Sequence, residues 1–252
     1  MAPMRQAVPI DLMRIDAPSR EARQLVLFAA GCSVVACAAA LAITRWPLPL
    51  YPSADFTADA WYVVGFKVVF MLGGALLWLR WRGYRLADVL GRWRPTGLGW
   101  LGIGLALGAG VLVNMQHVAP LRDLLRGGAP AGRLVLGAVL ALASAAIPEE
   151  LVFRALLQTR LEKAFNRLTA IGLSTLLFAL WHLPSRFLLS SGVEGSAGDL
   201  ASILMGTGLP VFVVGLVFAA IWDRWRNFSI LVALHFAIDV LPALRHAAGG
   251  SF

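Results

Sequence analysis

Charged residues are scarce in this sequence, where Asp, Glu, Lys and Arg make up 14% of 252 residues, against about 25% in an average soluble domain. Hydrophobic residues reach 59%, and the mean hydropathy is +0.74 over the whole length. One buried core cannot account for so much apolar sequence. The scarcity of charge therefore excludes an ordinary soluble domain and predicts several lipid-facing segments.

Cysteine is also rare, and no signal peptide is evident. The two cysteines, Cys32 and Cys37, lie in one apolar run and form no CxxC motif, so we expect them to act as small buried apolar residues. Residues 1–24 are mixed in charge and lack the apolar core of a signal peptide. We expect them to form a cytoplasmic N-terminal segment, followed by a single transmembrane domain over residues 25–246.

Seven apolar runs approach the roughly 20 residues that a helix needs to cross the hydrocarbon core of a bilayer. They predict an all-α, polytopic membrane helix bundle of about seven transmembrane helices, or eight if residues 184–198 hold a short extra helix. The predicted spans are Leu25–Ile43, Trp61–Leu79, Leu98–Met115, Arg133–Arg160, Leu168–Leu189, Leu200–Trp222 and Phe228–Leu244. Small-residue pairs, Gly104 with Gly108 and Gly73 with Gly74, predict close helix packing in two of them.

The basic residues sit at the ends of the apolar runs. A net charge of +8 can indicate a nucleic-acid partner, but such proteins gather Lys and Arg on one face or tail. With the N-terminus inside, the inner segments carry 14 Lys and Arg residues and the outer segments six. This bias predicts a cytoplasmic N-terminus and contact with lipid rather than with nucleic acid.

A few ionisable residues lie within the predicted spans, where charge is costly and usually functional. Glu150 and Arg154 are four residues apart, on one helix face, and are expected to form an ion pair. Glu149 points away from them and has no local cation, so it needs a partner on another helix or a water-filled pocket. Lys67, near the centre of the second span, is expected to snorkel or to pair with a carboxylate.

Two further groups complete the set: His182 in the fifth span, and His235 with Asp239 on one face of the last span. Counted from the basic residues at the inner helix ends, at about 1.5 Å per residue, Glu149 and these three residues lie roughly 14 to 22 Å deep. Three helices could therefore bring them to one pocket.

A carboxylate and an imidazole in such a pocket can activate a water molecule, and a second imidazole can stabilise an oxyanion. The same Glu149, His182 and His235 could instead bind zinc, with one position open for water. The sequence contains no HExxH motif, and the absence of GxSxG argues against a serine hydrolase of that type.

The three motifs together resemble a known family. EExxxR at Glu149–Arg154, FxxxH at Phe178–His182 and HxxxD at His235–Asp239 are similar in order and spacing to the CPBP family. This is the CAAX protease and bacteriocin-processing group, also called Abi, which includes the Ras-converting CAAX endopeptidase. The resemblance covers residues 133–244.

The resemblance implies an intramembrane endopeptidase, with either a glutamate or a metal mechanism, acting on a membrane-presented peptide or protein tail. In that reading Glu149 and His182 activate water, His235 and Asp239 hold the oxyanion, and Glu150 and Arg154 support them. It also implies an integral protein of a bacterial inner membrane. Asparagine stands at the position of Asp239 in the eukaryotic-type pattern. An ionised aspartate cannot donate to an oxyanion, so Asp239 would be protonated, orient His235 or bind a metal.

Two other functions fit the same composition. One is a non-enzymatic immunity or scaffold protein that keeps the fold, and the other is a proton- or metal-coupled transporter. A transporter would be expected to show inverted repeats and broken helices in both halves, and the sequence shows neither. The substrate, its prenylation and the oligomeric state are not encoded in any motif.

Overall fold

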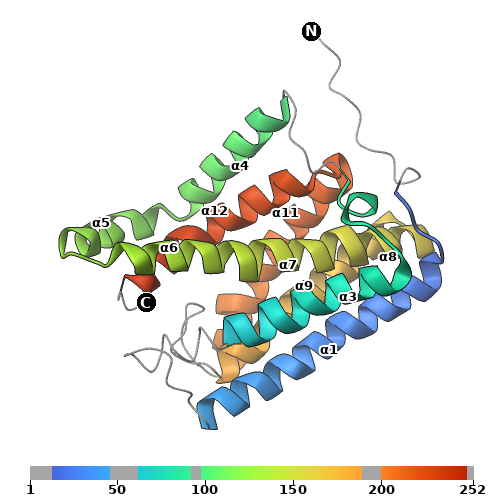
Figure 1. The fold of residues 1–252 in the computed structure, drawn as a ribbon, viewed down its shortest axis with the longest axis horizontal. Coiled ribbons are helices and arrows are strands. Elements are labelled where there is room, and N and C mark those ends of the chain that lie inside the picture. Colours follow the sequence, from blue (N-terminus) through green and yellow to red (C-terminus); the bar gives the residue numbers. More distant parts are fainter. Residues whose placement is uncertain (1–12, 46–61, 92–97, 189–199, 249–252) are drawn as a thin grey trace.

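The computed structural model describes residues 13–45, 62–91, 98–188 and 200–248, and in these ranges the chain folds as a bundle of helices (Figure 1). Four of the elements, η2, η5, η6 and η7, are π-helical, and η3 and η4 are short 3₁₀ turns. The elements are α1 (Pro18–Arg45), η2 (Tyr62–Leu72), α3 (Gly73–Arg82), η3 (Leu86–Asp88), α4 (Leu98–Val113), η4 (Met115–His117), α5 (Val118–Arg126), α6 (Ala131–Leu140), η5 (Ala141–Ala146), α7 (Ile147–Glu149), η6 (Glu150–Gln158), α8 (Thr159–Ala164), α9 (Arg167–Leu188), α10 (Leu200–Ile203), η7 (Leu204–Gly208), α11 (Leu209–Trp225) and α12 (Phe228–Ala247).

The predicted class, a polytopic helical membrane bundle, is confirmed. Each of the seven predicted apolar runs falls on helix, within the described residues. By length and composition four helices can cross a membrane, or five if a pair of helices bent by 64° counts as one span. The predicted number of seven stays a prediction. The four are Pro18–Ala39, Ala131–Ala164, Leu200–Trp225 and Phe228–Ala247, and the bent pair is Gly99–Val113 with Met115–Arg126.

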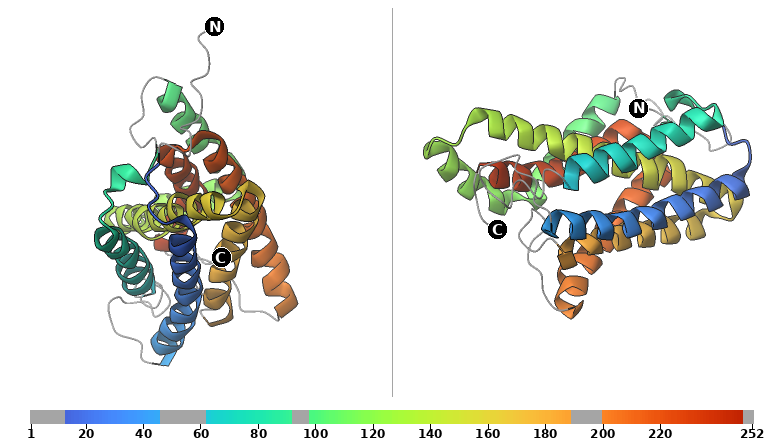
Figure 2. Two further views of the ribbon diagram at one scale, coloured as in Figure 1. Left: turned by 90° about the vertical axis from the view of Figure 1, so that its right-hand side faces the viewer. Right: turned by 60° about the horizontal axis from the view of Figure 1, so that its bottom comes forward.

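The central element is the continuous helix over residues 131–164, made of α6, η5, α7, η6 and α8 (Figure 1). It was predicted as one long helix over Arg133–Arg160, and it is one. Pro148 lies inside it and cannot donate a backbone hydrogen bond, and wide π-helical turns precede and follow it at η5 and η6. Helices α1 and α3 lie on one side of this helix, and α4 and α12 on the other (Figures 1 and 2).

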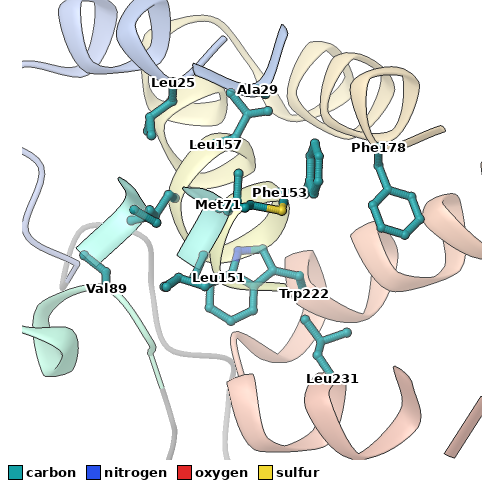
Figure 3. Packing of buried hydrophobic residues seen from close by; sticks show 14 of the residues in the cluster. Leu25, Ala29, Met71, Val89, Leu151, Phe153, Leu157, Phe178, Trp222 and Leu231 are labelled. Atoms are coloured by element: carbon teal, nitrogen blue, oxygen red, sulfur yellow. The ribbon is translucent and has the colours of Figure 1, made fainter. Parts of the chain in front are cut away.

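The buried core surrounds η6. Leu151, Phe153 and Leu157 of η6 are all fully or almost fully buried. Side chains from α1, η2, α9, α11 and α12 belong to the same cluster (Figure 3), among them Leu25, Ala29, Met71, Phe178, Trp222 and Leu231. Many leucines and valines on the outside are exposed, for example Leu105 and Leu112 of α4, as expected of helices that face lipid. The core therefore holds η6 in place from several sides.

Close packing of α4 depends on other glycines than predicted. A Cβ at Gly110 would lie 2.5 Å from the Ala237 Cβ of α12, and at Gly74 it would lie 2.9 Å from the ring of Phe28. A Cβ at Gly104 or Gly108 would meet nothing within 4 Å in the described part of the chain. The prediction is thus confirmed for Gly74 and wrong for the Gly104–Gly108 pair, because the face of α4 that meets α12 is a different one.

A second buried cluster of charges links α1 to the start of α8. Glu21 is fully buried and accepts hydrogen bonds from Arg82 (2.7 Å), Tyr84 (2.7 Å) and Arg160 (3.2 Å). Helix α1 begins at Pro18, so it includes residues that we assigned to the N-terminal segment. The segment Pro184–Gly198 is partly described, since α9 continues to Leu188, and residues 189–199 lie outside the described ranges.

Candidate active site

The central helix and two others, α9 and α12, position the predicted site residues. Glu149 is the last residue of α7, and Glu150 and Arg154 follow in η6. His182 lies in α9, and His235 lies one helical turn before Asp239 in α12. The predicted residues therefore come from the three expected segments, and the contacts among them decide what the site can do.

Glu149 lies at the centre of these residues and is 1% exposed. Its Oε2 atom is 3.6 Å from His182 Nε2 and 3.6 Å from His235 Nε2. Its Oε1 atom is 3.4 Å from the ammonium of Lys67, which lies in η2. The expectation that Glu149 finds its partners on other helices is confirmed.

His182 is oriented by its own helix. Its Nδ1 lies 2.7 Å from the carbonyl oxygen of Phe178, one turn earlier. A carbonyl only accepts, so Nδ1 carries the proton, and in the neutral ring Nε2 is then an acceptor. The rings of Phe178 and Trp181 flank the imidazole at centroid distances of 4.7 and 5.0 Å. The FxxxH spacing thus places the acceptor nitrogen of His182 toward Glu149.

His235 lies between two carboxylates. Its Nδ1 is 2.8 Å from Glu150 Oε1, and its Nε2 is 3.2 Å from Asp239 Oδ2. The Asp239 side chain is 35% exposed, whereas His235 and Glu150 are buried. The ring is therefore held at both nitrogens, and Asp239 lies at the more open side of the site.

Arg154 contacts Glu150 from the next turn of the same element, η6. Its Nε lies 3.7 Å from Glu150 Oε2, so the predicted ion pair is confirmed, and its Nη2 donates to the carbonyl of Gly215 at 3.3 Å. The guanidinium also stacks over Phe178, 4.5 Å from the ring centroid. A Cβ at Gly215 would meet Phe178 and a threonine side chain at 3.0 Å, so α11 approaches Arg154 closely because a glycine stands there.

Residues 131–241, which hold Glu149, His182, His235 and Asp239, match the family model of type II CAAX prenyl endopeptidase, Rce1-like. This region, which is less than half of the chain, is thus a domain of the CAAX protease type. No curated protein and no solved structure matches it. The resemblance inferred from the three motifs is thereby confirmed, and its extent, residues 133–244, agrees closely with the matched range.

The zinc alternative can be compared with the geometry of the matched domain. In the described ranges no group of three or more His, Cys, Asp or Glu side chains is arranged to hold a metal ion. A ring that donates from both nitrogens, as His235 would to Glu150 and Asp239, has no lone pair left for a metal. The Lys67 ammonium beside Glu149 also adds a positive charge where a divalent cation would need a negative one. The zinc alternative gains no support from this geometry.

Two residues of the site lay outside the predicted set. Lys67 contacts Glu149, and Trp181 lies under the Lys67 ammonium, 4.7 Å from Nζ to the ring centroid. Lys67 was expected either to snorkel or to pair with a carboxylate, and it does the second. In the sequence, Lys67 is a lone basic residue in an apolar run, and Trp181 lies far from any predicted span end. Neither feature indicates which residue is the partner.

Proposed function

We propose that this chain is an intramembrane endopeptidase that hydrolyses a peptide bond with a water molecule activated by Glu149 and His182. The observation that carries the proposal is the position of Glu149 Oε2. It has no hydrogen-bond partner among the described residues and lies 3.6 Å from two imidazole nitrogens. That separation is too long for a direct hydrogen bond, and a water molecule bonded to Oε2 can reach the nitrogens.

In the first step Glu149 takes a proton from this water, and the water oxygen attacks the carbonyl carbon of the scissile bond. His182 Nε2, an acceptor in the tautomer fixed by Phe178, aligns the water by accepting its other hydrogen. The carbon–nitrogen bond then breaks, and Glu149 returns its proton to the leaving amine. The products are a carboxylic acid and an amine, which then exchange a proton to become a carboxylate and an ammonium, so atoms and charge balance without a further reactant.

His235 supplies the donor for the oxyanion in this proposal. Its Nε2 lies 3.6 Å from Glu149 Oε2, so it faces the point where the carbonyl oxygen becomes negative. Before the oxyanion forms, Asp239 accepts this same hydrogen, 3.2 Å away, and so orients the ring rather than contacting the oxyanion itself. Among the three roles open to Asp239, the contact with His235 favours this one.

The substrate in this proposal is a peptide or protein tail presented at the membrane. The protein itself is integral to a membrane, as its long apolar helices require. The excess of basic residues in the inner segments supports a cytoplasmic N-terminus, and the resemblance supports a bacterial inner membrane. Whether the tail is prenylated is a question for the substrate series below.

The test is cleavage by the purified full chain in liposomes, with quenched peptides that include prenylated and unprenylated C-terminal tails. Glu149→Gln should lower kcat by at least about 10²-fold, the usual contribution of a general base. Asp123→Asn, which removes an exposed carboxylate of α5, is the matched control and should cleave normally. Wild-type cleavage should also persist in chelator.

Other outcomes would overturn specific parts of the proposal. Full activity in Glu149→Gln would exclude this carboxylate as the base. Loss of activity in chelator with recovery on adding zinc would show a metal mechanism. If no peptide is cleaved by the wild type, the immunity or scaffold function becomes the better one, and uptake of a solute into the liposomes would identify a transporter.

A further inference from the structure

Lys67 is a buried ammonium outside the matched family domain. It lies in η2, whereas the domain covers residues 131–241. The residue is 6% exposed, and burial of an ammonium in an apolar region is costly unless a negative partner compensates it. No motif of the sequence includes Lys67, so its place in the structure needs a separate explanation.

The contacts of Lys67 lead directly to the candidate base. Its Nζ lies 3.4 Å from Glu149 Oε1 and sits over the face of Trp181, 4.7 Å from the ring centroid. Trp181 in turn packs against Phe66, the residue before Lys67, at 5.8 Å between ring centroids. The aromatic face attracts the ammonium and limits where it can move, so Nζ is held against one oxygen of Glu149.

The other groups that face Glu149 cannot replace this charge. His182 approaches from α9 and His235 from α12, both at Oε2. On the central helix, Arg154 is engaged with Glu150, and Glu150 and Asp239 are carboxylates directed to His235. Within the described ranges, Lys67 is the only lysine or arginine in ion-pair contact with Glu149.

We propose that Lys67 is a positioning residue of the site, whose ammonium anchors Glu149 through Oε1 and leaves Oε2 directed to the water. This inference rests on the proposed function of Glu149 as the base. With Oε1 held by the ammonium, the second oxygen faces the two imidazoles. The matched domain thus uses the positive charge of a lysine in η2, which lies outside it.

The first test measures kcat and KM of Lys67→Met and Lys67→Arg, with Lys163→Met as the matched control. Lys67→Met should lower kcat by more than about tenfold, with KM little changed, because Glu149 is no longer held toward the water. Lys67→Arg keeps the charge and should retain most of the rate, as should Lys163→Met at an exposed position of α8. An unchanged kcat in Lys67→Met, or an equal loss in Lys67→Arg, would overturn the inference.

A second measurement needs no turnover. Thermal unfolding is compared for the wild type, Lys67→Met, Glu149→Gln and the double variant. If the two groups are paired, Glu149→Gln should reverse most of the Tm loss of Lys67→Met, since it removes the carboxylate left without its cation. Additive Tm changes would show that the pair is absent.

The two measurements separate this inference from the proposed function. An inactive Glu149→Gln beside a Lys67→Met enzyme of normal kcat overturns the inference alone. A fully active Glu149→Gln overturns the proposed function, and the unfolding comparison then still decides whether Lys67 and Glu149 form a pair.

Discussion

Glu150 Oε1 lies 2.8 Å from His235 Nδ1, although the two residues are 85 positions apart in the sequence. The second glutamate of the EExxxR motif was predicted to pair with Arg154, and it does so at 3.7 Å. Its shorter contact is with the histidine of the last motif. Glu150 therefore links the central helix to α12 and connects the buried arginine to the ring that lies beside the candidate base.

Replacing Glu150 tests this link. Glu150→Gln should keep the shape of the side chain and an acceptor for His235 Nδ1 but lose the charge, and kcat should fall by about tenfold because a neutral amide holds the ring less strongly than a carboxylate. Glu150→Ala should also lower the free energy of unfolding by about 3–5 kcal/mol, since it leaves the buried Arg154 without its carboxylate. Peptide cleavage and denaturant unfolding measure the two effects. Wild-type kinetics in Glu150→Gln would show that His235 needs no charged anchor at Nδ1.

At Asp239, unlike at Glu150, we expect the neutral amide variant to keep its activity. The carboxylate accepts at His235 Nε2 at 3.2 Å, and the carbonyl of an asparagine could accept in the same way while its amide donates to the oxyanion. Asp239→Asn should therefore remain active, whereas Asp239→Ala should lose at least about tenfold in kcat. Steady-state cleavage of one peptide by both variants checks this, and equal loss in both would mean that the charge of Asp239 is required.

Tyr84 makes the stability of the Glu21 cluster depend on alkaline pH. Tyr84 donates to Glu21 at 2.7 Å and accepts from the backbone of Asp16 at 2.9 Å. Burial, and then the bond to Glu21, raise the pKa of the Tyr84 phenol. Its contribution is fully present below the ordinary pKa of about 10 and is lost as pH rises through the raised value. Thermal unfolding of Tyr84→Phe should therefore show a smaller alkaline decrease in Tm than the wild type, and parallel curves would contradict this.

Gly91 is expected to tolerate no side chain. Its φ is +58°, and a Cβ there would lie 2.3 Å from the carbonyl oxygen of Arg226, where an antiparallel bridge pairs Gly91 with Asn227. Gly83 has a similar φ of +71° with nothing within 4 Å, so it is the matched control. Gly83→Ala should lose about 1–2 kcal/mol from backbone strain alone. Gly91→Ala should lose clearly more in denaturant unfolding, and equal losses would mean that the loop moves away from Arg226.

The class of the protein and the identity of most site residues could be predicted from the sequence for physical reasons. Apolar runs of sufficient length must be helices in a bilayer, because every backbone group needs an internal partner. A fixed rise per residue places Glu149, His182 and His235 at similar depth, so their meeting was predictable once three helices were assumed to touch. Four-residue spacing likewise predicts the contacts of Glu150 with Arg154 and of His235 with Asp239.

Partners on different helices could not be predicted, because these sequence patterns do not reveal which helix faces meet. Lys67 and Glu149 are 82 positions apart, and Arg160 and Glu21 are 139 apart. The packing of α4 on α12 through Gly110, and not through the predicted Gly104 and Gly108, has the same cause. The sequence by itself determined the helices and the depth of each ionisable group, since both follow from local spacing. Only the tertiary structure decided that Glu149 forms an ion pair with Lys67. The packing of the entire core sets how each helix is rotated and which helices touch.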